Sequence, residues 1–408
     1  MSFLKSLAKN LKKLKTAAAI LAPLVAGHAA TGQTTSANPP SVAPQTLEQR
    51  VEQLRGKMQK DDKGNLIVVD LEKCKAQTAD MALFEGEDSL KKLVLWGATI
   101  SNETMAALPV LPQLKELRLL NTSVTDSGLA ELARFPSLRS INLHRSSQLT
   151  DEGIEHLVKL KELTHFAAPY TKFTDEGVLQ LGALKKLRLL DLRGCTLSNK
   201  SLGVAPELPV LSSLKLRAPG IDDDGLIHLK NLKQLRGLHL EDAKLTDEGM
   251  QTLAGLVNLD DLNLLRVPFG DEGMAALAGM KKMRLLILRG TYVSDEGLAH
   301  LSEMSELAKL DLSETGVQGP GLAHLVGCTK LKWLNLWNSF VDDSAIEPLA
   351  KLTSLEDLNL NATLVTDDGL AKLATLKNLK KLSITQSSTT PAAAEKLKAA
   401  IPGVEVKQ

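Results

Sequence analysis

The chain has 408 residues, and 49 Lys and Arg against 48 Asp and Glu give it a formal net charge of +1 at pH 7. This balance provides no overall basic excess, so the composition does not favour nucleic acid as a partner. Aromatic residues are only 3% of the chain, which indicates a core filled by leucine rather than by large rings.

The N-terminal segment predicts export. Residues 1–15 carry five lysines, residues 16–26 are apolar and rich in alanine, and Gly27 and Ala29 are small. This layout is typical of a secretory signal peptide over residues 1–29, with the mature chain beginning near Ala30. The apolar run is short for a bilayer span, so we expect a secreted or periplasmic protein without a membrane span after signal removal. The alternative is a basic amphipathic helix, because four leucines share a face: Leu4, Leu7, Leu11 and Leu14.

The next two segments lead into the main domain. Residues 30–45 are rich in Thr, Ser, Pro, Gly and Ala, as in a flexible linker. Thr46 and Gln49 then form a capping-box pattern, and Leu47, Val51, Leu54 and Met58 give an apolar stripe. We therefore expect a capping helix within residues 46–65, followed by a repeat domain over 66–402 and a C-terminal tail over 403–408.

The repeat domain is defined by a fixed internal period. Each unit begins with alternating leucines, which suit a strand with one buried face, and continues into apolar residues at helical spacing. One such unit has nothing to bury its apolar faces against, so the units must stack into a solenoid. Every step is 24 residues except one of 25, and the first leucines are Leu90, Leu114, Leu138, Leu163, Leu187, Leu211, Leu235, Leu259, Met283 (in place of Leu), Leu307, Leu331 and Leu355.

When the first leucine is counted as position 1, three positions after the strand carry the same kind of residue in most repeats, and each set of equivalent residues is called a column. Ten of twelve residues at position 12 are Ser, Thr or Asp, as at Thr150 and Thr366, and we expect them to accept hydrogen bonds from free helix amides. The Asp column at position 13 suits the positive end of a helix, and its spacing does not fit a calcium loop. Glycine at position 15 predicts a close approach of the neighbouring unit.

The pattern LxxLxLxx(T/C)xx(V/L/I)(S/T)DxGLxxLxxL resembles the leucine-rich repeat family, and is similar to its cysteine-containing type and bacterial relatives with a TDxGL signature. The resemblance covers residues 66–402 and implies an α/β horseshoe with a parallel concave sheet and convex helices. Threonine replaces the family's usual cysteine in five units, as at Thr122 and Thr363. That departure weakens any link to substrate receptors of ubiquitin ligases.

Positions 3, 5 and 7 alternate with inward leucines and therefore face the concave side. All three tryptophans lie there, and tryptophan is enriched at interfaces. The candidate binding residues are Trp96, His144, His165, Arg193, Lys215, Arg217, His239, Arg289, Trp333, Asn335 and Trp337.

Enzyme motifs are missing from the sequence: it has no GxxxxGK(S/T), HExxH, GxSxG or CxxC. We therefore interpret the chain as a non-enzymatic, monomeric scaffold that binds a protein partner on its concave face and needs no cofactor or metal. The alternative is binding of a glycan or cell-wall polymer through Trp333 and Trp337 beside Asn335, Asn359 and Asn361; a ubiquitin-ligase receptor and an enzyme are weaker alternatives. The three cysteines lie at buried positions in distant units, so no disulfide is expected.

Overall fold

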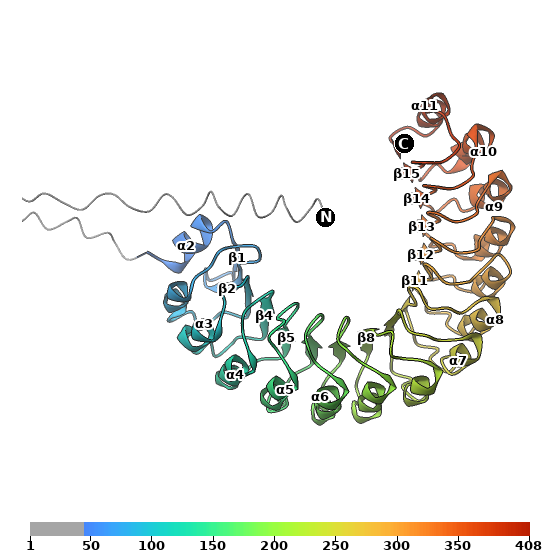
Figure 1. Cartoon of the computed structure of the whole chain (residues 1–408). Helices are drawn as coiled ribbons and strands as arrows, with labels where there is room; N and C mark the ends of the chain where they lie inside the picture. Colours follow the sequence, from blue (N-terminus) through green and yellow to red (C-terminus); the bar gives the residue numbers. More distant parts are fainter. Residues whose placement is uncertain (1–44) are drawn as a thin grey trace, which may run out of the picture. The chain divides into compact units, whose positions relative to one another are not determined.

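The computed structural model describes residues 45–408. In this part of the chain, sixteen strands form one sheet in sequence order, and every pair of neighbours is parallel except β1 and β2. Short α-helices and 3-10 helices lie on the outer side of the resulting arc, and the strands line its inner side (Figure 1). The predicted solenoid with a parallel concave sheet and convex helices is confirmed.

The strands are mostly three to five residues long. They are β1 (Lys57–Lys60), β2 (Leu66–Asp70), β3 (Lys92–Trp96), β4 (Glu116–Leu120), β5 (Ser140–Asn142), β6 (His165–Ala167), β7 (Leu189–Asp191), β8 (Ser213–Arg217), β9 (Gly237–Glu241), β10 (Asp261–Asn263), β11 (Leu285–Ile287), β12 (Lys309–Asp311), β13 (Trp333–Asn335), β14 (Asp357–Asn359), β15 (Lys381–Ser383) and β16 (Glu405–Lys407).

The outer elements alternate with these strands. The α-helices are α2 (Leu47–Gln53), α3 (Asn102–Ala107), α4 (Asp126–Leu129), α5 (Asp151–Leu157), α6 (Asp175–Gln180), α7 (Asp247–Gln251), α8 (Asp271–Met274), α9 (Ile346–Ala350), α10 (Asp367–Lys372) and α11 (Pro391–Ala400). The 3-10 helices are η1 (Thr78–Phe84), η2 (Ala130–Arg134), η3 (Leu181–Ala183), η4 (Asn199–Glu207), η5 (Asp223–His228), η6 (Ala275–Leu277), η7 (Gly297–Leu301), η8 (Pro320–Gly327), η9 (Asp343–Ala345) and η10 (Leu373–Thr375).

Leucine columns fill the inside of the arc. Leu262 on β10 faces Leu238 on β9 and Leu286 on β11, and all three are fully buried. Truncating such a leucine to alanine typically costs about 2–5 kcal/mol. The inward columns therefore fix the register of the strands, and the same register places the intervening residues on the concave face.

The Asp column links consecutive repeats. Oδ1 of Asp126 accepts the Thr150 N–H at 2.8 Å, and Oδ2 accepts the Thr150 hydroxyl at 2.7 Å. The same two bonds join Thr174 to Asp151, Ser198 to Asp175, Thr246 to Asp223, Ser294 to Asp271, Thr366 to Asp343 and Thr390 to Asp367.

The predicted capping role of position 12 is confirmed in part, because four of its side chains accept an N–H of their own helix: Ser198, Asp222, Thr246 and Asp342. The side chains of Thr150 and Thr366 make no such bond, and their hydroxyls donate only to the preceding repeat. The predicted close approach at the glycine column is confirmed. A Cβ at Gly153 would lie 2.5 Å from Oδ1 of Asp126, so glycine leaves the space that the linking carboxylate occupies.

Both ends of the solenoid differ from expectation. The capping helix ends at Gln53 because Arg55 adopts a left-handed φ of 58°, and the chain then forms β1, which pairs antiparallel with β2. The helix and this strand together cover the first edge. At the other end the predicted tail contributes β16, where Val406 faces Leu382. The predicted signal peptide and nearly all of the linker lie outside the described residues.

Candidate binding surface on the concave face

The sheet places the eleven predicted binding residues in three separate groups. Trp96 is on β3, away from the others. His144, His165, Arg193, Lys215, Arg217 and His239 lie on or directly after β5 to β9, and Arg289, Trp333, Asn335 and Trp337 lie on or directly after β11 and β13. Arg289 and Trp337 of the C-terminal group contact each other, and His165 and Lys215 of the middle group line one hollow, so the face carries two candidate sites.

The C-terminal group is organised around Trp337. The guanidinium carbon of Arg289 lies 4.8 Å from the centroid of the Trp337 ring, close enough for a cation–π interaction of about 0.5–2 kcal/mol. Nε of Arg289 also donates to Oε2 of Glu314 at 2.8 Å. Ser313 is small and fully buried, and it occupies the same strand position in the repeat between them. This contact assigns Arg289 to the tryptophan group.

Asn335 fixes the strand that carries both tryptophans. Its Nδ2 donates to Oδ1 of Asp311 at 3.0 Å, and its Oδ1 accepts the Trp337 N–H at 3.1 Å. Trp333 and Trp337 are both partly exposed. The group therefore presents two partly exposed indoles on a rigid backbone, and one of them is held by Arg289.

Two residues of the middle group line a shallow hollow of about 230 Å³. Small side chains from β5 and β6 leave this space open, because Ser140 and Ala167 occupy outward positions where other repeats carry longer residues. The polar residues that line it include Glu116, Arg118, His165, Asp191 and Lys215. His165 is exposed, so this hollow brings two predicted binding residues, His165 and Lys215, to one surface.

The arginines of the middle group are already paired. Arg193 donates to both carboxylate oxygens of Asp191, at 2.9 and 2.7 Å, and this pairing raises the pKa of its guanidinium despite burial. Arg217 and Arg266 both bind the carboxylate of Asp242. The hydrogen bond from Arg266, with a further one from Arg217, holds the pKa of Asp242 below its usual value against the opposing effect of burial. An anionic ligand would have to displace these internal partners.

His239 is covered rather than free. Its side chain points to the concave side, but the residue is only 7% exposed. Nε2 lies 3.0 Å from Oδ1 of Asp261, while Nδ1 is buried without a hydrogen-bond partner among the described residues. Burial raises the pKa of Asp261, but the hydrogen bond from His239 and the electrostatic attraction of His239 and Lys215 together lower the pKa below its usual value. His239 therefore offers little surface to a ligand in this structure, and its role in binding stays a prediction.

Tyr170 is a surface residue that the sequence reasoning missed. It occupies the left-handed turn after β6, with a φ of 61°, and its ring centroid lies 5.7 Å from that of His144. The guanidinium carbon of Arg145 is 5.5 Å from the same ring. Burial lowers the pKa of His144. The sequence could have indicated this residue, because Tyr170 is an aromatic residue that directly follows the outward-facing positions of its strand.

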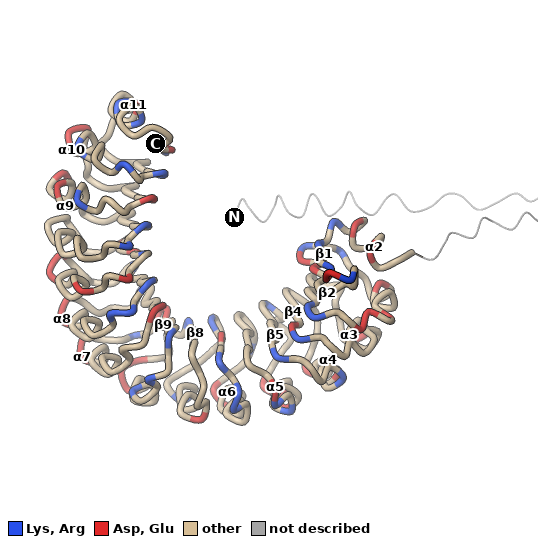
Figure 2. Tube along the Cα trace, turned by 180° about the vertical axis from the view of Figure 1, so that it is seen from behind, with Lys and Arg blue, Asp and Glu red and all other residues tan. Residues whose placement is uncertain are grey.

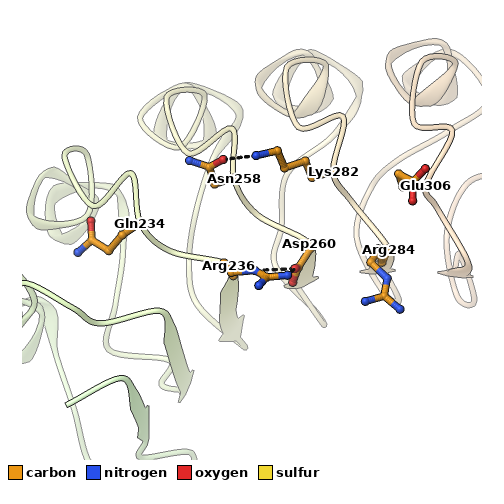
Figure 3. Close-up of a pocket in the computed structure, with 7 residues that line it drawn as sticks. All are labelled: Gln234, Arg236, Asn258, Asp260, Lys282, Arg284 and Glu306. Carbon is orange, nitrogen blue, oxygen red and sulfur yellow. Dashed lines mark hydrogen bonds and ion pairs between the residues drawn. The ribbon is translucent and has the colours of Figure 1, made fainter. Parts of the chain in front are cut away.

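Another hollow, of about 430 Å³, lies where the chain returns from the helices to strands β9 to β12 (Figure 3). Arg236 pairs with Asp260, and Nζ of Lys282 donates to Oδ1 of Asn258 at 2.7 Å. The remaining lining residues are Gln234, Arg284 and Glu306. Such an alternating ladder of exposed charges is typical of a solvated edge, and surface pairs of this kind contribute little stability.

The three cysteines behave as predicted. Cys74, Cys195 and Cys328 are free and buried, and burial raises the pKa of the Cys328 thiol to about 11. Within residues 45–408, no cluster of three His, Cys, Asp or Glu side chains is arranged to hold a metal ion. In the same residues, no helix has the length and apolar character needed to cross a membrane.

Comparisons with known proteins identify the fold. No protein-family model matches the chain. A stretch of 68 residues, 16% of the chain, is 41% identical to a Caenorhabditis elegans protein named as RNA-binding, but it spans only 9% of that protein. That share is too small to transfer the name.

Solved structures match over most of the chain. An internalin from Listeria monocytogenes has a TM-score of 0.53 and 22% identity, covering 75% of this chain and 88% of that one. A leucine-rich repeat protein from Leptospira interrogans has a TM-score of 0.51 and 19% identity, covering 87% and 94%. The mouse RP105/MD-1 complex gives 0.57 and 17%, covering 83% and 63%. These neighbours are leucine-rich repeat proteins, and the chain shares their fold.

Proposed function

We propose that this chain is a non-enzymatic scaffold that binds another protein on its concave face. The observation that carries the proposal is the group formed by Trp333, Trp337 and Arg289, in which one indole is held by a cation–π contact of 4.8 Å. Tryptophan and arginine dominate the energetic centres of protein interfaces. Five of the chain's seven phenylalanines are fully buried, whereas Trp333 and Trp337 are both partly exposed.

The arrangement also lowers the cost of binding. Immobilising a side chain at an interface costs roughly 0.5–1.5 kcal/mol, and the contacts of Trp337 with Arg289 and of its N–H with Asn335 restrict it beforehand. One of the structural neighbours, mouse RP105, is in complex with the protein MD-1. A protein partner for this chain is consistent with that use of the fold.

The proposal includes several features that accompany such a scaffold. We assign it to the type with the TDxGL signature and 24-residue repeats, acting as a monomer without a cofactor. The lysine-rich start followed by an apolar run supports export to the periplasm or the exterior. Trp96, on β3, lies ten strands from β13, roughly 48 Å before curvature, so a ligand that engages both ends is a macromolecule.

A glycan is the second candidate ligand. Asn359 and Asn361 lie beside the tryptophan group and use their Oδ1 atoms to accept backbone N–H groups. Their Nδ2 atoms have no hydrogen-bond partner in residues 45–408. Two indoles with nearby amide donors can bind a sugar by stacking and hydrogen bonding, which supports a cell-wall polymer as the alternative ligand at this site.

The experiment begins by screening the secreted chain against arrays of extracellular proteins and of cell-wall glycans. For the strongest ligand, the double substitution Trp333→Ala and Trp337→Ala should weaken binding at least about tenfold, or 1.4 kcal/mol. Charge reversal on the convex helices, Glu155→Lys or Lys372→Glu, should leave the affinity unchanged. Thermal unfolding checks that each variant is folded.

The arrays separate the two candidates, because a glycan that binds through the tryptophans without any protein ligand replaces the protein-partner proposal. Loss of binding in the convex variants, with no effect of the tryptophan substitutions, would refute the concave-face assignment.

A further inference from the structure

A row of exposed apolar side chains lies outside the concave face, on the edge of the solenoid formed by the turns that lead from each strand to the next helix. Tyr292, Phe340 and Leu364 are 72%, 63% and 57% exposed. They occupy position 10, in the turn between strand and helix. Gly316 occupies the same position between Tyr292 and Phe340. In most other repeats this position is small or polar, as at Thr99, Ser123, Lys172, Thr196, Gly220, Lys244 and Ser388.

Backbone hydrogen bonds align this row. The N–H groups of Gly316, Phe340 and Leu364 each donate to the carbonyl of the preceding repeat, at Val293, Val317 and Val341. The side chains therefore lie on successive steps of roughly 5 Å. Residues three or four apart on an α-helix rise by about the same distance along its axis. An amphipathic helix laid along the edge can match the row with its apolar face.

The same edge is acidic and contains no Lys or Arg. The four turn segments are 290–297, 314–321, 338–345 and 362–369, and their only charged residues are Asp295, Glu296, Glu314, Asp342, Asp343, Asp367 and Asp368. Glu314 pairs with Arg289, while the other six carboxylates have no ion-pair partner in the described part of the chain. Figure 2 shows acidic residues near α9 and α10 along this part of the arc.

We infer that this apolar and acidic edge, formed by repeats 9 to 12, binds a basic amphipathic helix of a partner protein. Its apolar residues would contact Tyr292, Phe340 and Leu364, and its lysines or arginines would face the unpaired carboxylates. Nucleic acid and anionic membranes are repelled by the same charges. The inference does not depend on the concave-face proposal, because the two surfaces use different residues.

The probe is a synthetic helical peptide of about 18 residues, with leucine on one face and lysine on the other, and titration uses the chain beginning at Ala30. We expect binding that weakens with salt, and no binding of the same peptide with glutamate in place of lysine. Tyr292→Ser with Phe340→Ser should weaken binding about tenfold. Glu296→Gln with Asp368→Asn should weaken it and reduce its salt dependence; neither side chain makes a hydrogen bond within the described residues, so the repeat linkage stays intact.

Ile227→Ser is the matched control, because Ile227 is also 59% exposed but lies on η5. It should change the affinity less than twofold, as should Trp333→Ala with Trp337→Ala. Failure of the wild-type chain to bind the lysine peptide would overturn the inference. Equal binding of the glutamate peptide, or loss of binding only in the tryptophan variant, would do the same.

Discussion

Replacing Gly249 by alanine tests the linkage between repeats. The added methyl group restricts the unfolded chain, which stabilises the fold, but it also displaces a carboxylate that links two repeats, which destabilises the fold. Gly249 is the position-15 glycine of the repeat that carries α7. A Cβ added to it would lie closer than 3.0 Å to Oδ1, Cγ and Oδ2 of Asp223, which are its three nearest atoms. That carboxylate accepts the Thr246 N–H at 2.9 Å and the Thr246 hydroxyl at 2.6 Å. The alanine would therefore displace Asp223 and break both bonds.

The expected sign follows from the magnitudes. Glycine to alanine without steric conflict stabilises by about 0.4–1 kcal/mol through the unfolded chain. One hydrogen bond to a charged acceptor contributes roughly 1.5–3 kcal/mol when protected from water, and each of these two contributes much less because Thr246 is exposed. We expect Gly249→Ala to lower the free energy of unfolding by about 1–2 kcal/mol. The midpoint of urea denaturation measures the change.

The control is Gly255→Ala, whose nearest neighbour would be the Lys230 carbonyl oxygen at 3.9 Å. This variant should be neutral or slightly more stable. In an Asp223→Ala background, Gly249→Ala should no longer destabilise, and the double-mutant cycle should give a coupling of at least about 1 kcal/mol. If Gly249→Ala is as harmless as Gly255→Ala, or if the cycle shows no coupling, then the carboxylate does not explain the glycine column.

Two further predictions concern ionisable groups. The folded chain should contain three unreactive thiols and no disulfide, because the cysteines are buried and free and the pKa of Cys328 is raised to about 11. Thiol titration should detect three groups only after denaturation. Fewer than three thiols in the denatured chain without reductant would contradict this prediction. The lowered pKa of Asp242 means that its pairing with Arg217 and Arg266 stabilises the fold above the unfolded pKa of about 3.9, and that this contribution is lost as the pH falls through the folded value. The free energy of unfolding of Asp242→Asn should therefore be lower than that of the wild type at pH 7, by under about 1 kcal/mol. Urea denaturation should show that this difference shrinks below pH 4. A constant difference from pH 7 to pH 2 would exclude this pairing as the cause.

The leucine columns could be predicted because they depend on local spacing. Residues that alternate along a strand face opposite sides of it, so Leu262, Leu286 and Leu310 had to point inward once the strands were recognised. Trp333 and Trp337 were placed on the concave side by the same argument. Thr46 and Gln49 marked the start of the capping helix, because the preferences of helix ends are local as well.

The contacts between repeats needed the tertiary structure. Asp126 and Thr150 are 24 residues apart, and only the stacking of two turns shows that the hydroxyl binds this carboxylate rather than its own helix. Arg289 reaches Trp337 past the intervening Ser313, and His239 is covered by neighbours on other strands. The sequence thus determined which way each side chain points, because that depends on backbone periodicity. Only the structure decided which side chains meet, because that depends on the distances between neighbouring repeats.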